Sequence, residues 1–243
     1  MKNNPVRPEG LSHNELLVEM GLGPQWRLRT TTAALAEQRE GTPATLGMPA
    51  KAASQPSQSD RPTQPLQPQP GESCEQRIAR MDWAELAWET AHCQACGLCR
   101  QRQQAVLGVG DTAADWLFIG EGPGAEEDAR GEPFVGQAGK LLDAMLCAIG
   151  LRRGDDVYIA NAVKCRPPNN RTPEVDEIAA CKPYLLRQIE LLQPRLIVLL
   201  GRVAVQALLG ESGTLAALRA KTFSHRTARG EIPMLVSYHP AYL

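Results

Sequence analysis

The sequence has few aromatic residues, almost no net charge and no long hydrophobic run. Phe, Trp and Tyr make up 5% of the 243 residues, and the formal net charge is −1. Any surface that attracts phosphates therefore has to come from local clustering of Lys and Arg. No stretch of about 18 apolar residues is present, which excludes a predicted membrane span. Residues 1–29 lack the apolar core and cleavage site of a signal peptide, so we expect a cytoplasmic protein.

Composition divides the chain into three predicted regions. Residues 1–29 contain a short amphipathic segment, with Leu16, Leu17 and Met20 at helical spacing. Residues 30–75 are rich in Pro, Gln and Ser, and no aromatic residue occurs between Trp26 and Trp83. Such a stretch cannot bury enough apolar area to offset the entropy of ordering it, so we expect a disordered linker. The folded domain is predicted to span residues 76–243.

Strand and helix patterns alternate within that domain. Short apolar runs predict strands at 116–120, 157–161, 196–200 and 234–238, and helical periodicity predicts helices at 76–92, 138–149, 172–192 and 203–209. This alternation predicts an α/β fold, a three-layer α/β/α sandwich around a central, mainly parallel four-stranded sheet. Because ligands bind beyond the carboxyl ends of parallel strands, the residues after each strand are the candidates for a site.

The first predicted strand is followed by an acidic, glycine-rich loop, Gly120-Glu-Gly-Pro-Gly-Ala-Glu-Glu-Asp128. Its acidity disfavours a phosphate cradle, which would use backbone amides and a Lys. A carboxylate at Glu121 could instead polarise a water molecule for attack on a neutral ligand held by the backbone. The alternative explanation for the acidic residues is structural, because a helix N-terminus favours negative charge. For Glu126 we prefer this structural explanation.

Three further side chains stand at predicted strand ends or in the adjoining loops. Phe134 lies in a glycine-flanked loop, where it is either a core residue or a platform for base stacking. Asn161 ends the second strand, and its amide has the donor and acceptor needed to bind one edge of a nucleobase. His239 precedes a proline at the end of the last strand, where an imidazole could stabilise an anionic leaving group. We expect these residues to converge with Glu121.

The seven cysteines predict a site for a soft metal. Cys93 and Cys96 form a CxxC motif, which overlaps a second one formed with Cys99, and Cys165 and Cys181 lie further along the chain. Four thiolates suit either zinc or an iron–sulfur cluster, and the spacing alone does not separate these two possibilities. Cys74 and Cys147 are expected to be unconnected thiols.

Three segments together resemble the family-4 uracil-DNA glycosylases: GEGPGAEEDARGEPFVGQAGKLL, YIANAVKCRPPNNRTPEVDEIAACKPYL and SYHPAYL. The resemblance covers about residues 93–243 and implies the uracil-DNA glycosylase fold. It implies a [4Fe–4S] cluster rather than zinc, held by Cys93, Cys96, Cys165 and Cys181, with Cys99 as an extra thiol. The cluster is expected to be structural.

The resemblance also implies hydrolysis of the N-glycosidic bond of deoxyuridine in DNA, after the base has been flipped out of the stack. The implied catalytic residues are Glu121, Glu127, Asn161 and His239. Uracil would be bound by Glu121, Gly122, Pro123, Phe134, Asn161 and His239. Asn161 would reject cytosine, one of the carboxylates would position or activate water, and His239 would stabilise the departing uracil. Lys164, Arg166 and Arg171 become candidate contacts to the DNA backbone.

Two departures from the family pattern lead to further expectations. The sequence stops three residues after Pro240, where family members continue through a loop that resembles a DNA wedge. The first 75 residues or so form an extension, in which residues 16–29 are similar to the N-terminal peptide of the replicative polymerase psi subunit. We therefore expect a replication or repair protein as a partner of a monomeric enzyme. The alternatives are a truncated, non-catalytic iron–sulfur protein that binds DNA and, less favoured, a cluster-based electron carrier.

Overall fold

The computed structural model describes residues 71–211 and 213–243. The predicted segment 1–29 and nearly all of the predicted linker lie outside the described residues. The first described helix, α2 (Cys74–Arg80), begins two residues before the predicted start of the domain. None of the described helices is long and apolar enough to cross a membrane.

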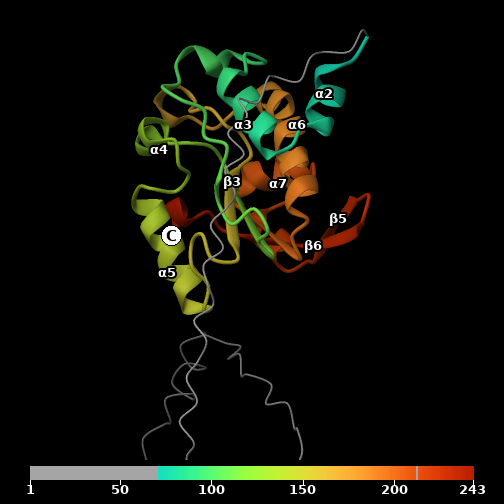
Figure 1. Cartoon of the computed structure of the whole chain (residues 1–243). Coiled ribbons are helices and arrows are strands. Elements are labelled where there is room, and N and C mark those ends of the chain that lie inside the picture. The colour runs from blue at the N-terminus through green and yellow to red at the C-terminus, as the bar shows by residue number, and fades with distance from the viewer. Residues whose placement is uncertain (1–70, 212) are drawn as a thin grey trace, which may run out of the picture. The chain divides into compact units, whose positions relative to one another are not determined.

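The described residues form an α/β fold around a six-stranded sheet with the order β1-β3-β2-β4-β6-β5 (Figure 1). The strands are β1 (Val109–Gly110), β2 (Trp116–Gly120), β3 (Val157–Asn161), β4 (Leu196–Leu200), β5 (Phe223–Thr227) and β6 (Gly230–Ser237). The four central strands are parallel, and the two edge strands are antiparallel. The predicted parallel sheet of four strands is confirmed as the centre of the sheet.

The prediction missed the two edge strands, for different reasons. β1 has two residues, too few to show any periodicity. β5 has no fully buried position, and its sequence Phe-Ser-His-Arg-Thr has little apolar character, because this strand covers the edge of the sheet rather than its centre.

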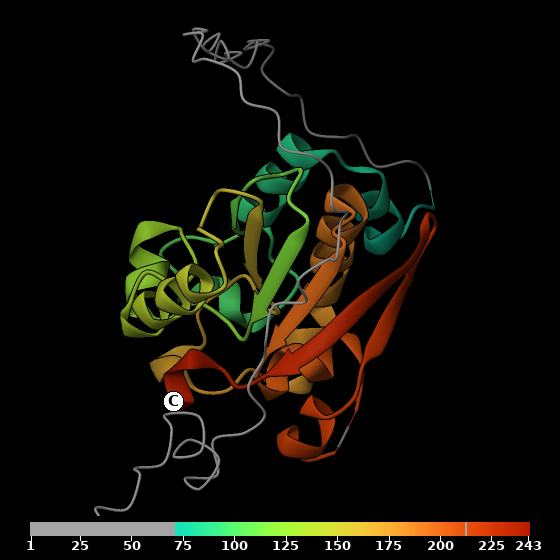
Figure 2. The ribbon, with the colours of Figure 1, turned by 90° about the horizontal axis from the view of Figure 1, so that it is seen from below.

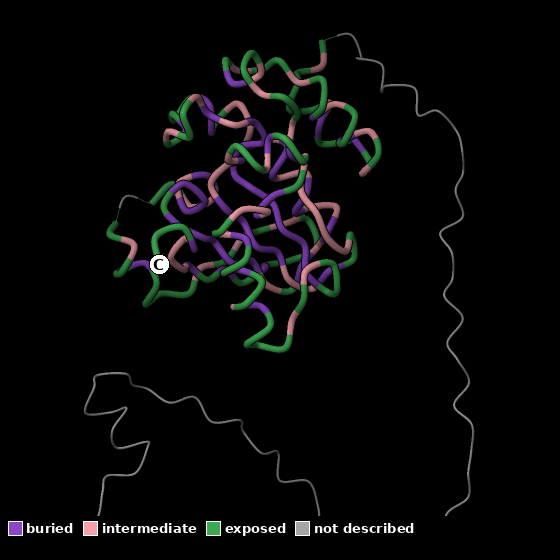
Figure 3. Tube along the Cα trace, turned by 90° about the vertical axis from the view of Figure 1, so that its left-hand side faces the viewer, coloured by how far each residue is buried: buried purple, intermediate pink, exposed green. Residues whose placement is uncertain are grey.

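Helices cover both faces of the sheet, and Figure 2 shows α5 (Gln137–Ala148) and α6 (Val175–Leu192) on opposite sides of it. Leu142 and Leu146 of α5 pack with Phe118 and Ile159 on one face. Leu185 and Ile189 of α6 pack with the other face, together with α7 (Arg202–Leu208). Because both faces are covered, β3 is buried at every position. Figure 3 shows buried segments of the trace in the interior, with exposed segments around them.

Two helix predictions need correction. The single helix expected at 76–92 is two helices, α2 and α3 (Trp83–His92), because Asp82 caps the second one with a side-chain hydrogen bond to the amide of Glu85. The helix expected to start after Thr172 begins at Val175, where Glu174 forms a capping box with Glu177. Apolar residues flank both acidic caps, with Met81 and Trp83 around Asp82 and Pro173 and Val175 around Glu174, so apolar periodicity does not reveal either boundary.

The remaining helices are short. They are α4 (Ala125–Arg130), α8 (Leu215–Arg219) and the 3₁₀ turns η1 (Gly97–Arg100), η2 (Pro168–Asn170) and η3 (Pro240–Tyr242). α2 and α3 pack on α6 through a small cluster of Ile78, Met81, Leu86 and Tyr184. This packing places the end of α3, where the CxxC motifs begin, next to α6.

Candidate functional site

A cavity of about 240 Å³ lies at the carboxyl ends of β2, β3 and β6. The residues predicted at the strand ends meet here: the lining includes Glu121, Gly122, Pro123, Glu127, Phe134, Asn161 and His239. The convergence follows from the topology, because parallel strands place their carboxyl ends at one edge of the sheet. Tyr242, which the sequence analysis did not single out, also lines the cavity and is 76% exposed.

Asn161 presents an unsatisfied acceptor at this cavity. Its side chain is 2% exposed, and Oδ1 has no hydrogen-bond partner among the residues that the structure describes. A buried acceptor without a partner costs about 1–3 kcal/mol. A ligand that donates a hydrogen bond to Oδ1 would remove this cost, so the cavity is suited to a molecule with an N–H or O–H group at that point.

Phe134 and His239 form one wall of the cavity. Their ring centroids are 5.3 Å apart and their planes are inclined by 28°. Phe134 has a φ of 55°, a strained value for an aromatic residue. Gly139 of α5 approaches the Phe134 carbonyl so closely that a Cβ at Gly139 would lie 1.8 Å from its oxygen. The close approach of α5 is thus to the backbone of Phe134, and a side chain at position 139 would displace it.

His239 is held in one tautomer. Its Nδ1 accepts a hydrogen bond of 3.2 Å from the backbone amide of Ala241, so the proton of a neutral ring lies on Nε2. Burial lowers the pKa of His239, and Glu127 opposes this effect. The ring is consequently neutral at pH 7 and can donate one hydrogen bond from Nε2.

The two candidate carboxylates have different surroundings. Glu127 accepts hydrogen bonds from the amides of Gly124, Val135 and Gly136 at 3.0–3.1 Å, and so ties the acidic loop to the loop that carries Phe134. The side chain of Glu121 accepts no hydrogen bond from the described residues, and burial raises its pKa. Glu127 is thus committed to holding the loops, whereas Glu121 is free to act on a bound molecule.

The four cysteines that the family resemblance implies as cluster ligands lie around one small cavity. Cys93, Cys96, Cys165 and Cys181 line one small cavity with Lys164 and Tyr184, and Cys99 does not line it. Cys99 lines an adjoining open hollow, which Cys93 and Cys96 also line. Burial raises the pKa of Cys96, Cys165 and Cys181, so these thiols are not free nucleophiles.

The four thiols that line the small cavity are a donor set that an iron–sulfur cluster can use. No three Cys, His, Asp or Glu side chains of residues 71–211 and 213–243 are arranged to hold one metal ion. A cluster is several atoms across and keeps its ligands further apart. The Arg102 guanidinium donates to Cys165 Sγ at 2.8 Å and the Lys164 amide donates to Cys181 Sγ at 3.2 Å, as expected around cluster thiolates. Nothing in the sequence singled out Arg102.

The basic residues predicted to contact DNA differ in their surroundings. The prediction for Lys164 is wrong, because its side chain is 1% exposed and is bonded inside the protein. Arg171 lines the strand-end cavity and forms two hydrogen bonds with Glu177. Arg166 donates to Asn170, which lines the same cavity. Arg166 and Arg171 therefore remain candidates for binding phosphate.

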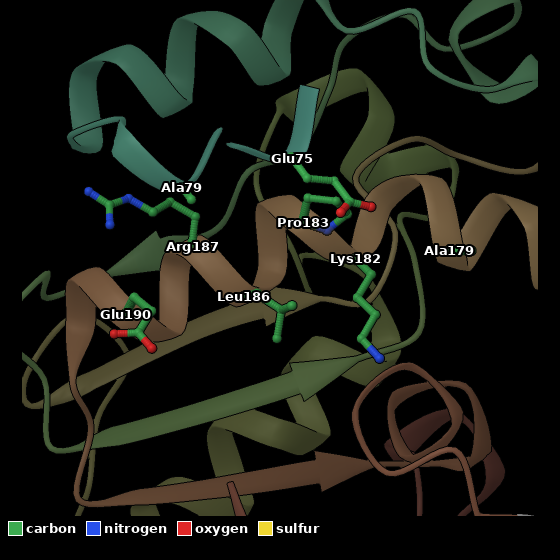
Figure 4. Close-up of a pocket in the computed structure, with 8 residues that line it drawn as sticks. All are labelled: Glu75, Ala79, Ala179, Lys182, Pro183, Leu186, Arg187 and Glu190. Atoms are coloured by element: carbon green, nitrogen blue, oxygen red, sulfur yellow. The ribbon is translucent and has the colours of Figure 1, made fainter. Parts of the chain in front are cut away.

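A larger hollow of about 420 Å³ lies between α2 and α6 (Figure 4). Its rim carries two acidic and two basic side chains: Glu75, Glu190, Lys182 and Arg187. It shares no residue with the strand-end cavity and contains no predicted catalytic residue. All of the predicted catalytic residues line the smaller, strand-end cavity.

The chain matches a known family of proteins. The model of the uracil DNA glycosylase superfamily matches residues 107–243. The chain belongs to this superfamily. It is 44% identical over 161 residues to a type-4 uracil-DNA glycosylase of Archaeoglobus fulgidus, a match that covers 65% of this chain and 80% of that protein.

Two further relatives place the chain within the superfamily. It is 45% identical over 152 residues to the type-4 uracil-DNA glycosylase of Thermotoga maritima, which covers 62% of this chain and 77% of that enzyme. It is 36% identical over 149 residues to a type-5 uracil-DNA glycosylase of Thermus thermophilus, which covers 55% of this chain and 68% of that enzyme. The higher identities to the type-4 enzymes support membership of family 4.

Proposed function

We propose that this protein is a uracil-DNA glycosylase that hydrolyses the N-glycosidic bond of deoxyuridine in DNA, releasing uracil and leaving an abasic site for base excision repair. The superfamily match and the type-4 relatives support the activity. The observation that carries the proposal for this site is the buried, unsatisfied Oδ1 of Asn161 at a strand-end cavity.

Uracil binds in this cavity after it has been flipped out of the DNA stack. Asn161 Oδ1 accepts from N3–H of uracil, and its amide nitrogen donates to O4. Cytosine has an acceptor at N3 and a donor amine in place of O4. Its acceptor would face Asn161 Oδ1 and its amine would face the Asn161 amide nitrogen, so neither hydrogen bond could form. Phe134 stacks on the ring, and the backbone at Glu121, Gly122 and Pro123 fixes the base carbonyls.

The C1′–N1 bond breaks with its electron pair moving to uracil, which leaves as an anion, while positive charge develops on the sugar. His239 donates from Nε2 to the uracil carbonyl O2, and a neutral donor is suited to an anion that forms only as the bond breaks. Glu121, when ionised, stabilises the sugar cation and takes a proton from the attacking water. Glu127 positions the loops that carry Glu121 and Phe134.

A [4Fe–4S] cluster held by Cys93, Cys96, Cys165 and Cys181 fits the second site. When bound, it cross-links α3, the segment after β3 and α6, and supplies no step of the hydrolysis. The cross-link fixes the chain a few residues beyond Asn161. Arg166 and Arg171 would contact the DNA phosphates beside the flipped base.

The experiment is excision of uracil from an oligonucleotide that contains a single uracil, followed by alkaline cleavage of the abasic product. The wild-type protein should release uracil, and Asn161→Ala should lower the single-turnover rate by about 10²- to 10³-fold. A wild-type protein that binds the oligonucleotide without cleaving would instead support the non-catalytic, DNA-binding alternative.

Residues 1–29 are proposed to dock a replication or repair partner on a protein that is otherwise monomeric. Deletion of residues 1–30 should leave excision from naked DNA unchanged and abolish capture of that partner. Capture that persists after the deletion contradicts the docking role.

A further inference from the structure

Lys164 is a buried cation between the candidate active site and the four cysteines. Its ammonium group donates to the backbone carbonyl of Asn161 at 2.7 Å and to Oε1 of Gln188 at 2.5 Å. Its side chain is 1% exposed, so neither water nor DNA can reach the charge. A buried ammonium group is costly unless a negative charge or several acceptors compensate for it.

No carboxylate compensates for this charge. None of the ion pairs among residues 71–211 and 213–243 includes Lys164. Cysteines surround Lys164 instead: Cys165 is the next residue, and the Lys164 backbone amide donates to Cys181 Sγ at 3.2 Å. Lys164 also lines the cavity into which the four cysteines converge. A cluster bound by these cysteines would therefore supply the negative charge that Lys164 otherwise lacks.

The second acceptor of Lys164 is itself fixed. The Gln188 amide nitrogen donates to the backbone carbonyl of Leu107 at 2.9 Å and to the hydroxyl of Tyr158 at 3.3 Å. These bonds turn the amide oxygen of Gln188 toward Lys164. A preorganised acceptor of this kind holds the ammonium group in one position, with a second bond to Asn161.

We propose that Lys164 is the internal counter-cation of the cluster and the positioning residue that ties the cluster to Asn161. The inference rests on the proposed cluster and on the proposed role of Asn161 in binding uracil. The Lys164 side chain then compensates the charge of the cluster from inside the protein, and the Arg102 guanidinium compensates it through its hydrogen bond to Cys165. The Lys164 side chain also fixes the backbone carbonyl of the residue that recognises uracil.

Two measurable consequences follow for the cluster. A nearby positive charge favours the added electron, so loss of Lys164 should make the reduction potential of the cluster more negative. The same loss leaves the thiolates less well compensated, and the cluster should be released to a chelator about 10- to 100-fold faster. A role confined to packing would change the free energy of unfolding and leave the potential unchanged.

The test compares Lys164→Met with Lys182→Met in the full chain after cluster reconstitution. Lys182 follows Cys181 directly, as Lys164 precedes Cys165, but it lines the hollow between α2 and α6 rather than the cysteine cavity. Lys164→Met should show the more negative potential, the faster loss of visible absorbance to the chelator and a lower single-turnover rate on uracil. Lys182→Met should match the wild-type protein in all three measurements.

Gln188→Glu provides a second variant that keeps Lys164 in place. The new carboxylate would pair with the ammonium group and cancel its charge toward the cluster, so the potential should again become more negative. Potentials of Lys164→Met or Gln188→Glu that equal the wild-type value overturn the counter-cation role. An unchanged uracil rate in Lys164→Met overturns the positioning role. Failure of the proposed glycosylase function would appear separately, as a wild-type protein that holds its cluster but releases no uracil.

Discussion

Gly120, the last residue of β2, lies directly against the side chain of Asn161. A Cβ built on Gly120 would be 2.5 Å from Asn161 Oδ1 and 2.5 Å from Cζ of Phe134. The absence of a side chain at this position therefore leaves space for two of the groups proposed to hold uracil. Gly120 pairs with Asn161 in the sheet, so the space is set by backbone register.

Gly120→Ala should displace both Asn161 and Phe134. Displacements of about 1 Å in an active site can cost about 100-fold in rate, and we expect a loss of that order in single-turnover excision of uracil. Gly213→Ala is the matched control, because a Cβ there would meet only Leu218 at ordinary contact distances. The cluster absorbance should be unchanged in both variants, and full activity of Gly120→Ala contradicts the proposed placement of uracil.

Glu121→Gln should stabilise the protein while it removes activity. Burial raises the pKa of Glu121, so an ionised carboxyl at this position makes the folded state less stable as pH rises through that pKa. The Gln variant should unfold at a higher denaturant concentration at pH 7, and the difference should disappear below pH ~4, where both side chains are neutral. Uracil excision at pH 7 should fall by about 10²- to 10⁴-fold.

Glu127→Ala and Glu127→Gln should separate loop positioning from general-base catalysis. The alanine variant leaves three backbone amides without their acceptor and should lose about 1–3 kcal/mol of unfolding free energy along with most activity. The glutamine variant keeps one acceptor oxygen, which can still bind Val135 and Gly136. We expect its activity to be intermediate, whereas equal inactivity of the two variants would indicate that Glu127 activates water.

Cys165→Ala and Cys99→Ala should differ in the cluster. Cys165 lines the same cavity as Cys93, Cys96 and Cys181, and Cys99 does not. The first variant should lose the visible absorption band and bound iron, and its melting temperature should fall because a cross-link between distant segments is lost. The second should retain both signals. Loss of iron in Cys99→Ala would point to a ligand set different from the proposed one.

The sequence predicts the strand-end residues well because topology alone brings them together. Glu121 follows β2 and Asn161 ends β3, and these two strands are parallel neighbours, so the positions of both residues along the chain determine that they meet. The same logic fails for Lys164. The segment Lys-Cys-Arg-Pro-Pro has the composition of an exposed basic loop, and only the packing of α6 over it shows that Lys164 points inward to Gln188.

Contacts between side chains that are distant in the sequence could not be predicted, for a similar reason. Arg102 reaches Cys165 across 63 positions of the chain, and no periodicity or motif specifies that contact. Glu127 was chosen as a catalytic candidate because it is acidic and close to a strand end. Its three amide partners come from loop geometry, which depends on how α5 approaches Phe134.

The placement of β6 in the sheet bears on the order in which the active site is made. β6 pairs with β4 inside the sheet, and His239 follows directly after it. A ribosome therefore completes Glu121, Phe134 and Asn161 well before it adds the strand that delivers His239. A nascent chain can place Glu121, Phe134 and Asn161 early, but it gains the leaving-group donor only when the β5–β6 hairpin pairs with β4.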